Sequence, residues 1–283
     1  MSAAEFCPVG RVEKLLLATD RSDYSEGAVR EAISLAATCA AELYAVSVIE
    51  INPEYETFGT DIIEKEEKEA MAYFESLKER ARKEGVTCQT ILRESGDPHR
   101  LIVEEAEKKK ADMIIIGRHG RKGLAKVLMG SVVGKVIGNA PCNVLVVPRA
   151  ARIEFRNILA ATDGSAHGNA AVSSAIEIAR RCGSHIIALS SYFLDNDLEE
   201  ARTNVNNAMK EARKEGMSVE GITPRGRPHD AIVETAGGRA VDLIVMGAYG
   251  KTGLKKLLMG SSTEKVIGLA GCAVLVARSA ASG

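Results

Sequence analysis

Gly117–Val147 reads GRHGRKGLAKVLMGSVVGKVIGNAPCNVLVV, and Gly247–Ala277 reads GAYGKTGLKKLLMGSSTEKVIGLAGCAVLVA, which is the same stretch 130 residues later. Eighteen of the 31 aligned positions are identical, whereas unrelated segments share about one position in fifteen. The same offset carries GDPH at Gly96–His99 onto GRPH at Gly226–His229. The sequence therefore contains an internal duplication, and its fold is that of one repeated unit.

Nearer the N-terminus the offset between the two copies is larger. LLLATD ends at Asp20 and ILAATD ends at Asp163, 143 residues apart, and Cys39 matches Cys182 at the same offset. The second copy is thus shorter by 13 residues, and the gap falls between its second strand and its second helix. We predict two domains, at residues 1–150 and 151–283, in line with about 100–200 residues per domain.

Each copy alternates buried apolar runs with amphipathic segments, which predicts alternating strands and helices. In the first copy, apolar runs predict strands at Lys14–Thr19, Glu42–Ile49, Val86–Leu92, Met113–Ile116 and Asn143–Val147. Helices are predicted at Ser22–Ala41, Ile62–Glu84, Pro98–Lys110 and Ser131–Asn139. This order is typical of an α/β fold, so we expect two tandem, doubly wound, parallel five-stranded sheets of Rossmann-like type.

The composition argues against several classes of partner. Lys and Arg number 37 against 38 Asp and Glu, and aromatic residues are 4% with no Trp. No nucleic-acid or anionic-membrane surface is expected from this balance.

The chain has neither an apolar leader nor the roughly 18-residue apolar run of a membrane span, which favours the cytoplasm. None of the six cysteines forms a CxxC pair, so we expect reduced cysteines that pack as small apolar side chains.

A candidate ligand site lies where parallel strands end, because ligands of such sheets bind outside the carboxyl ends of the strands. An aspartate closes the first strand of each copy, Asp20 and Asp163. A glycine pattern follows the fourth strand, with Gly117 and Gly120, then nine residues, then Gly130-Ser131, and likewise Gly247, Gly250 and Gly260-Ser261. The glycines directly after strand four, Gly117 and Gly120 in the first copy, are expected to adopt positive φ and approach a ligand. The helix that starts at Gly-Ser offers free N–H groups and a positive dipole end to phosphate.

This pattern, G-x2-G-x9-G-S after strand four with an aspartate closing strand one, resembles the universal stress protein family in its ATP-binding form. The resemblance covers almost the whole chain twice. It implies a fold similar to the adenine nucleotide alpha hydrolases and a stress-response or regulatory module that binds ATP, with ADP or AMP as alternatives and Mg²⁺ as a companion ion. Carried over, the nucleotide-binding candidates are Thr19, Asp20, Val48, Gly117, Arg118, Gly120, Gly130, Ser131 and Val132 in the first copy, and Thr162, Asp163, Gly247, Gly250, Gly260, Ser261 and Ser262 in the second.

The two copies depart from the family pattern at different points. The partner of Val48 is Ser191, so the second adenine wall is more polar. After Gly-Ser the first copy has Val132-Val133-Gly134, and the second has Ser262-Thr263-Glu264, which is nearer the family pattern. Arg118 and Arg121 are expected to offset phosphate charge in the first copy. The hydroxyl-rich helix start predicts the tighter phosphate site in the second.

Other interpretations remain open. Asp20 and Asp163 are also typical helix N-caps. A partner-binding scaffold whose clefts hold another small or apolar ligand is the alternative function. An enzyme such as an ATP pyrophosphatase or adenylyltransferase is disfavoured, because the loops read ATDRSD and ATDGSA and there is no Walker lysine. We therefore expect no catalytic residue, no metal-ligand set, and at most slow ATP hydrolysis.

The fifth strand of each copy is apolar and would lie at a sheet edge, at Val144–Val147 and Val274–Ala277. Exposed apolar edges invite pairing, and single-domain members of the family pair through this strand. We predict that the two copies form a pseudo-dimer within one chain, with further homodimerisation and unidentified protein partners as open possibilities.

Overall fold

The structure is a computed structural model that describes residues 7–51, 60–119, 129–251 and 259–278. In the first half, strands and helices alternate in the order β1 (Lys14–Ala18), α1 (Glu26–Cys39), β2 (Glu42–Glu50), α2 (Thr60–Lys83), β3 (Cys88–Ser95), α3 (Pro98–Lys109), β4 (Met113–Gly117), α4 (Ser131–Asn139) and β5 (Asn143–Val147). The second half repeats this order as β6 (Asn157–Ala161), α5 (Ala166–Cys182), β7 (His185–Leu189), α6 (Leu198–Lys214), β8 (Val219–Ile222), α7 (Pro228–Gly238), β9 (Leu243–Gly247), α8 (Ser261–Leu269) and β10 (Ala273–Ala277).

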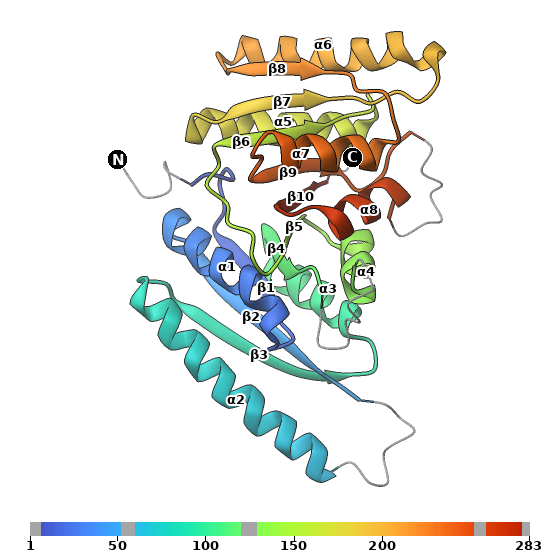
Figure 1. Ribbon diagram of the computed structural model, residues 1–283. Helices are drawn as coiled ribbons and strands as arrows, with labels where there is room; N and C mark the ends of the chain where they lie inside the picture. The colour runs from blue at the N-terminus through green and yellow to red at the C-terminus, as the bar shows by residue number, and fades with distance from the viewer. Residues whose placement is uncertain (1–6, 52–59, 120–128, 252–258, 279–283) are drawn as a thin grey trace.

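All the strands form one sheet of ten, in the order β3-β2-β1-β4-β5-β10-β9-β6-β7-β8 (Figure 1). Within each half the neighbouring strands are parallel. The halves meet where β5 and β10 pair antiparallel, with Leu145 opposite Leu275. The predicted doubly wound α/β fold is confirmed, and so is the pairing of the two fifth strands. The two five-stranded sheets are continuous rather than separate.

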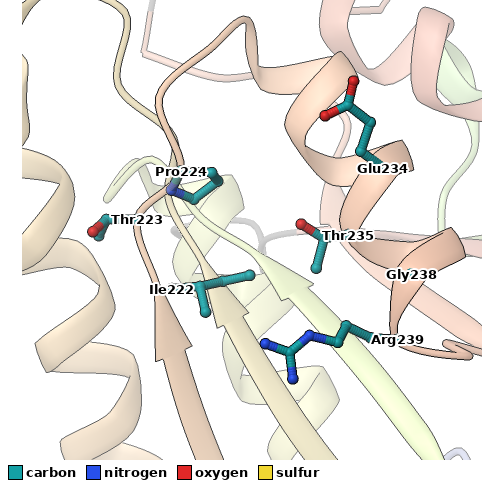
Figure 2. Close-up of a pocket in the computed structure, with 7 residues that line it drawn as sticks. All are labelled: Ile222, Thr223, Pro224, Glu234, Thr235, Gly238 and Arg239. Carbon is teal, nitrogen blue, oxygen red and sulfur yellow. The ribbon is translucent and has the colours of Figure 1, made fainter.

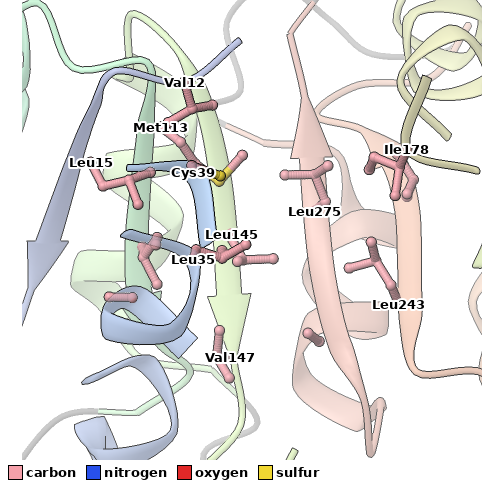
Figure 3. Close-up of a cluster of buried hydrophobic side chains, with 14 of the residues drawn as sticks. Val12, Leu15, Leu35, Cys39, Met113, Leu145, Val147, Ile178, Leu243 and Leu275 are labelled. Atoms are coloured by element: carbon pink, nitrogen blue, oxygen red, sulfur yellow. The ribbon is translucent and has the colours of Figure 1, made fainter. Parts of the chain in front are cut away.

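Each face of the sheet carries one apolar core that runs through both halves. Buried residues of α1, α2, α5 and α6 belong to one cluster, and those of α3, α4, α7 and α8 belong to the other. Alternate strand residues supply the two clusters, because successive side chains of a strand point to opposite faces; Leu15 lies in the first cluster and Leu16 in the second. Figure 3 shows the first cluster crossing the junction, with Leu145 and Leu275 on facing strands.

Two predicted boundaries shift for local reasons. Helix α1 begins at Glu26 rather than Ser22, because Ser22 caps a short 3-10 turn at Asp23–Ser25 by accepting from the Tyr24 amide. Strand β3 runs to Ser95 rather than Leu92, since it pairs with β2 as far as Glu50. Gly85 has a φ of +73° after α2, as a C-terminal glycine should.

The expectation that all six cysteines are reduced is wrong for one pair. Cys7 and Cys39 form a disulfide, and both residues are buried. The bond holds the N-terminal segment on the end of α1, while the Cys7 carbonyl accepts from Arg181 of α5 at 3.5 Å. This segment therefore touches both halves. Cys88, Cys142, Cys182 and Cys272 are free thiols, and burial raises the pKa of Cys142 to about 12.

Among the described residues, no helix combines the length and apolar character of a membrane span.

Candidate functional site

Strand β1 ends in a turn that its own side chains organise. The Thr19 hydroxyl accepts from the Arg21 amide at 3.0 Å, and the Asp20 carboxylate accepts from the Ser22 amide at 3.2 Å and from its hydroxyl at 2.8 Å. Thr19 is buried. Arg21 has a φ of +68°, a conformation that costs a non-glycine residue about 1–2 kcal/mol. The turn is therefore held by hydrogen bonds that outweigh local strain.

Strand β6 ends in the same turn with nearly the same distances. The Thr162 hydroxyl accepts from the Gly164 amide at 3.1 Å, and the Asp163 carboxylate accepts from the Ser165 amide at 3.0 Å. Gly164 has a φ of +77°, so glycine fits where the first half carries a strained arginine. Ser165, not Asp163, caps α5 by accepting from the Gly168 amide at 3.1 Å. The N-cap interpretation of the aspartates is therefore wrong, because the serine two residues later is the cap: Ser165 caps α5, and Ser22 caps the 3-10 turn before α1.

Helix α2 closes over the turn of the first half. The Tyr73 hydroxyl lies 3.1 Å from the Thr19 hydroxyl. The Arg21 guanidinium donates to the Glu66 carboxylate at 2.6 Å and to the Glu66 carbonyl at 2.9 Å, and only 5% of the arginine side chain is exposed. These contacts tie the strand-one loop to the helix, which limits access from the α2 side.

Helix α6 makes a lighter contact in the second half. The sequence ARKEG at Ala81–Gly85 recurs at Ala212–Gly216, which aligns Tyr73 with Asn204. The Asn204 amide donates to the Ser190 hydroxyl at 3.4 Å, and its oxygen would lie 2.4 Å from a Cβ added at Gly164. A short amide thus stands where the first half has a phenol ring.

The first glycines of the motif serve packing rather than backbone conformation. Neither Gly117 nor Gly247 has a positive φ. A Cβ at Gly247 would lie 2.6 Å from His167 Cβ, and one at Gly117 would lie 3.1 Å from the Tyr24 carbonyl oxygen. The expected positive φ is therefore wrong at these two positions; glycine is needed because strand four passes directly beneath the first helix of its half. Gly120 lies outside the described residues.

The second glycines cap helices α4 and α8 in the same way. Gly130 and Gly260 are N-caps with extended backbone, and neither helix start has a side-chain cap hydrogen bond. The Gly130 amide donates to the Arg118 carbonyl at 3.0 Å, and the Gly260 amide donates to the Ala248 carbonyl at 2.9 Å. Each contact closes the loop after strand four. The Val133 amide donates to the Gly130 carbonyl at 3.2 Å. The first amides of a helix have no acceptor within the helix, and an anion site uses such donors.

Gly250 brings the loop after β9 against the strand-one aspartate. A Cβ at Gly250 would lie 2.6 Å from the Asp163 carboxylate, which accepts from the Lys251 amide at 2.7 Å. The Lys251 ammonium pairs with Glu200 of α6. Three segments therefore meet at Asp163, and glycine is required by the close approach of the carboxylate.

In each half, a histidine and a tyrosine join the start of the first helix to the loop after strand four. Tyr24 lies edge-on to His119, with ring centroids 6.2 Å apart, and the rings of His167 and Tyr249 are tilted by 54° with centroids 5.4 Å apart. The offsets 143 and 130 align Tyr24 with His167 and His119 with Tyr249. Each half therefore keeps the contact with its two residue types swapped. The two alignment offsets place these residues at equivalent positions, but the sequence alone does not predict that the rings are in contact.

Comparisons with known proteins agree with this arrangement. The universal stress protein family model matches residues 11–148 and 190–278, which is more than half of the chain. The chain belongs to the universal stress protein family. Universal stress protein MJ0531 of Methanocaldococcus jannaschii is 39% identical over 145 residues, covering 48% of this chain and 82% of that protein. A universal stress protein of Mycolicibacterium smegmatis is 28% identical over 210 residues, covering 69% and 70%.

A solved universal stress protein from Archaeoglobus fulgidus has the same fold over nearly the full length. It superposes with a TM-score of 0.80 at 21% identity, covering 95% of this chain and 97% of that one. The likeness extends across both halves, so the tandem arrangement is shared.

Some candidates of this universal stress protein lie apart from the helix starts. The Arg118 guanidinium donates to the Gly268 and Ala270 carbonyls of the other half, at 3.2 and 2.8 Å. It caps the end of α8, and burial lowers its pKa. The Thr263 hydroxyl donates to the Gly247 carbonyl at 3.0 Å and is buried, so it is not available to phosphate. These contacts remove support for Arg118 and Thr263 as phosphate ligands.

The remaining candidates lie at the strand ends or in the first helical turns. Val48 is half-buried on β2, and Ser191 is half-buried just after β7. Val132 and Ser262 are half-buried in the first turns of α4 and α8, and Ser131 and Ser261 are exposed. Within the described ranges, no group of three or more His, Cys, Asp or Glu side chains could hold a metal ion.

Proposed function

We propose that each half binds one adenine nucleotide at the carboxyl ends of its strands, ATP first, with ADP or AMP as alternatives. The observation that carries this proposal is the repeated geometry. In the first half, the turn aspartate follows β1 and the Gly-Ser helix start, which has no side-chain cap, follows β4. In the second half, the same two features follow β6 and β9. The two strands are neighbours in the sheet in each half. We further propose that the protein is a regulatory or stress-response module of the cytoplasm rather than a fast enzyme.

Each group has a chemical role in this proposal. The amides of the first turns of α4 and α8 would bind phosphate oxygens, aided by the helix dipole and by the Ser131 and Ser261 hydroxyls. The aspartate carboxylate would accept from ribose hydroxyls or hold a bridging Mg²⁺ while it keeps its bonds to the loop amides. Val48 and Ser191 would lie beside the base.

The first test blocks phosphate approach. Gly260→Val would place a branched side chain at the helix start, where a Cβ lies 3.3 Å from the Ala248 carbonyl oxygen. Loss of one charge-assisted phosphate bond, at about 1.5–3 kcal/mol, should weaken ATP binding about ten- to hundredfold at this site. Gly130→Val should do the same in the first half. Isothermal calorimetry with ATP measures both effects.

Gly271→Val is the matched control, because a Cβ there meets nothing within 4 Å. It should leave both binding events unchanged. If Gly130→Val, Gly260→Val and the double variant all bind ATP as the unchanged protein does, nucleotide binding at the helix starts is wrong. Mass spectrometry of the purified protein provides a direct check. Co-purifying nucleotide supports the proposal, and a co-purifying apolar ligand in its place supports the scaffold alternative.

The second test concerns asymmetry between the halves. We propose that the second half is the tighter phosphate site, because Ser262 offers a hydroxyl where the first half has Val132. Exchanging the residues separates this effect from others. Ser262→Val should weaken the tighter ATP-binding event about tenfold, which is about the value of one charge-assisted hydrogen bond. Val132→Ser should strengthen the weaker ATP-binding event by about the same factor. If calorimetry shows that Ser262→Val has no effect and that Ser131→Ala weakens the tighter ATP-binding event, the tighter phosphate site belongs to the first half.

A further inference from the structure

The second half contains a pocket of about 520 Å³ between the end of β8 and helix α7 (Figure 2). Its lining residues are Ile222, Thr223 and Pro224 on the strand side, and Glu234, Thr235, Gly238 and Arg239 on the helix side. None of them belongs to the proposed nucleotide sites. The pocket is a shallow hollow that is open to solvent over most of its extent, not an enclosed cavity.

The first half carries an ion pair at the aligned positions. The 130-residue offset aligns Thr223 with Arg93 and Thr235 with Glu105. The Arg93 guanidinium donates to Glu105 at 2.9 Å, and only 7% of the glutamate side chain is exposed. Lys108, which lies 3.8 Å from the same carboxylate, is aligned with Gly238. Three long charged side chains of the first half are thus replaced by two threonines and a glycine at the pocket.

The cation at the pocket is also particular to the second half. Arg239 aligns with Lys109, whose ammonium lies 4.6 Å from the centre of the Tyr44 ring. Ile187 replaces that ring in the second half, so the cation has no such partner. Arg239 instead pairs with Glu220 at 3.2 Å and remains half-exposed. A guanidinium has five N–H donors, so this single partner leaves donors for an anion.

The two charges of the lining lie at opposite ends. In Figure 2, Glu234 lies at the upper end and points outward, whereas Arg239 lies at the lower end and extends toward the strands. Ile222 and Pro224 form the apolar wall, and the Thr235 hydroxyl lies between the charges. An anionic group is therefore favoured at the Arg239 end, with an apolar body against Ile222 and Pro224.

We propose that this pocket binds a small organic carboxylate with an aliphatic body. Such a ligand replaces what the first half supplies from its own chain, namely the apolar stem of Arg93 and the carboxylate of Glu105. Its carboxylate pairs with the Arg239 guanidinium and accepts from the Thr235 hydroxyl. A planar fork of donors suits a carboxylate in two-pronged geometry. This site is separate from the nucleotide sites and does not depend on them.

Octanoate is a suitable probe, and the amide resonances of the full-length protein report where it binds. Saturable shifts are expected at Ile222–Thr223 and at Glu234–Arg239. The aligned first-half residues Leu92–Arg93 and Glu104–Lys109 should not shift, which makes them an internal control. Octanol has the same chain without the charge and should bind about tenfold more weakly, as should octanoate to Arg239→Gln.

The double variant Thr223→Arg/Thr235→Glu rebuilds the ion pair of the first half and should abolish octanoate binding. ATP titration of the same variant should be unchanged, so failure of this site and failure of the nucleotide proposal are distinguishable. Three results would each overturn the inference: no saturable shift in the millimolar range, equal binding of octanol and octanoate, or retained binding in the double variant.

Discussion

Replacing Leu275 with alanine is expected to lower the free energy of unfolding by about 2–5 kcal/mol, as for other buried leucines. Leu275 lies opposite Leu145 in the antiparallel pair of β5 and β10, and both are 2% exposed. The lost methyl groups leave a cavity where the cores of the two halves meet (Figure 3). Urea unfolding followed by circular dichroism measures the change.

Leu269→Ala is the matched control, since Leu269 lies on the neighbouring helix α8 and is 44% exposed. Its effect should stay within about 0.5 kcal/mol. Because the sheet and its two cores are continuous, both halves should unfold in a single transition. A Leu275→Ala variant as stable as Leu269→Ala, or one half that unfolds well before the other in the unchanged protein, would show that the junction does not couple the halves.

Replacing Cys7 with serine should cost about 3–4 kcal/mol of unfolding free energy. The disulfide to Cys39 closes a loop with a sequence separation of 32 residues, and loop-closure entropy for that length gives this value. The unchanged protein in reductant should lose the same amount. Urea unfolding with and without dithiothreitol provides the comparison.

Cys182→Ser supplies the control for the disulfide, because Cys182 aligns with Cys39, is exposed, and carries a free thiol. It should unfold like the unchanged protein, and reductant should still destabilise it. If reductant leaves the unchanged protein unaffected, or if Cys7→Ser and Cys182→Ser behave alike, the bond does not stabilise the fold.

Much of the fold could be predicted from the sequence because it depends on regular patterns. The repeat defines two units, apolar runs mark buried strands, and Pro98 marks the start of α3, as the structure has it. The pairing of β5 with β10 also followed, since two apolar edge strands must be covered. The start of α1 did not follow, because the 3-10 turn depends on the Ser22 hydroxyl rather than on periodicity.

The site was harder to predict because motifs do not show where side chains point. The glycine pattern after strand four predicted a positive φ, yet Gly247 is glycine because His167 lies against it. Arg118 looked like a phosphate ligand, yet its guanidinium crosses to the end of α8. The Thr263 hydroxyl is used by the Gly247 carbonyl. Each outcome is decided by a tertiary neighbour distant in the sequence, which a local pattern cannot identify.

The junction of β5 and β10 within one polypeptide also bears on how this protein can evolve. In a homodimer built from one gene, every substitution appears on both sides of the symmetry axis, so a change that helps one site is imposed on the other. Here each side mutates alone. Gly134 makes room for Met129 and Met259, whereas its counterpart is Glu264. Arg118 caps the end of α8, whereas its counterpart Ala248 has no side-chain donor for such a cap. Because the two copies of the ancestral domain are linked in one chain, each copy can acquire its own substitutions while both keep the common fold.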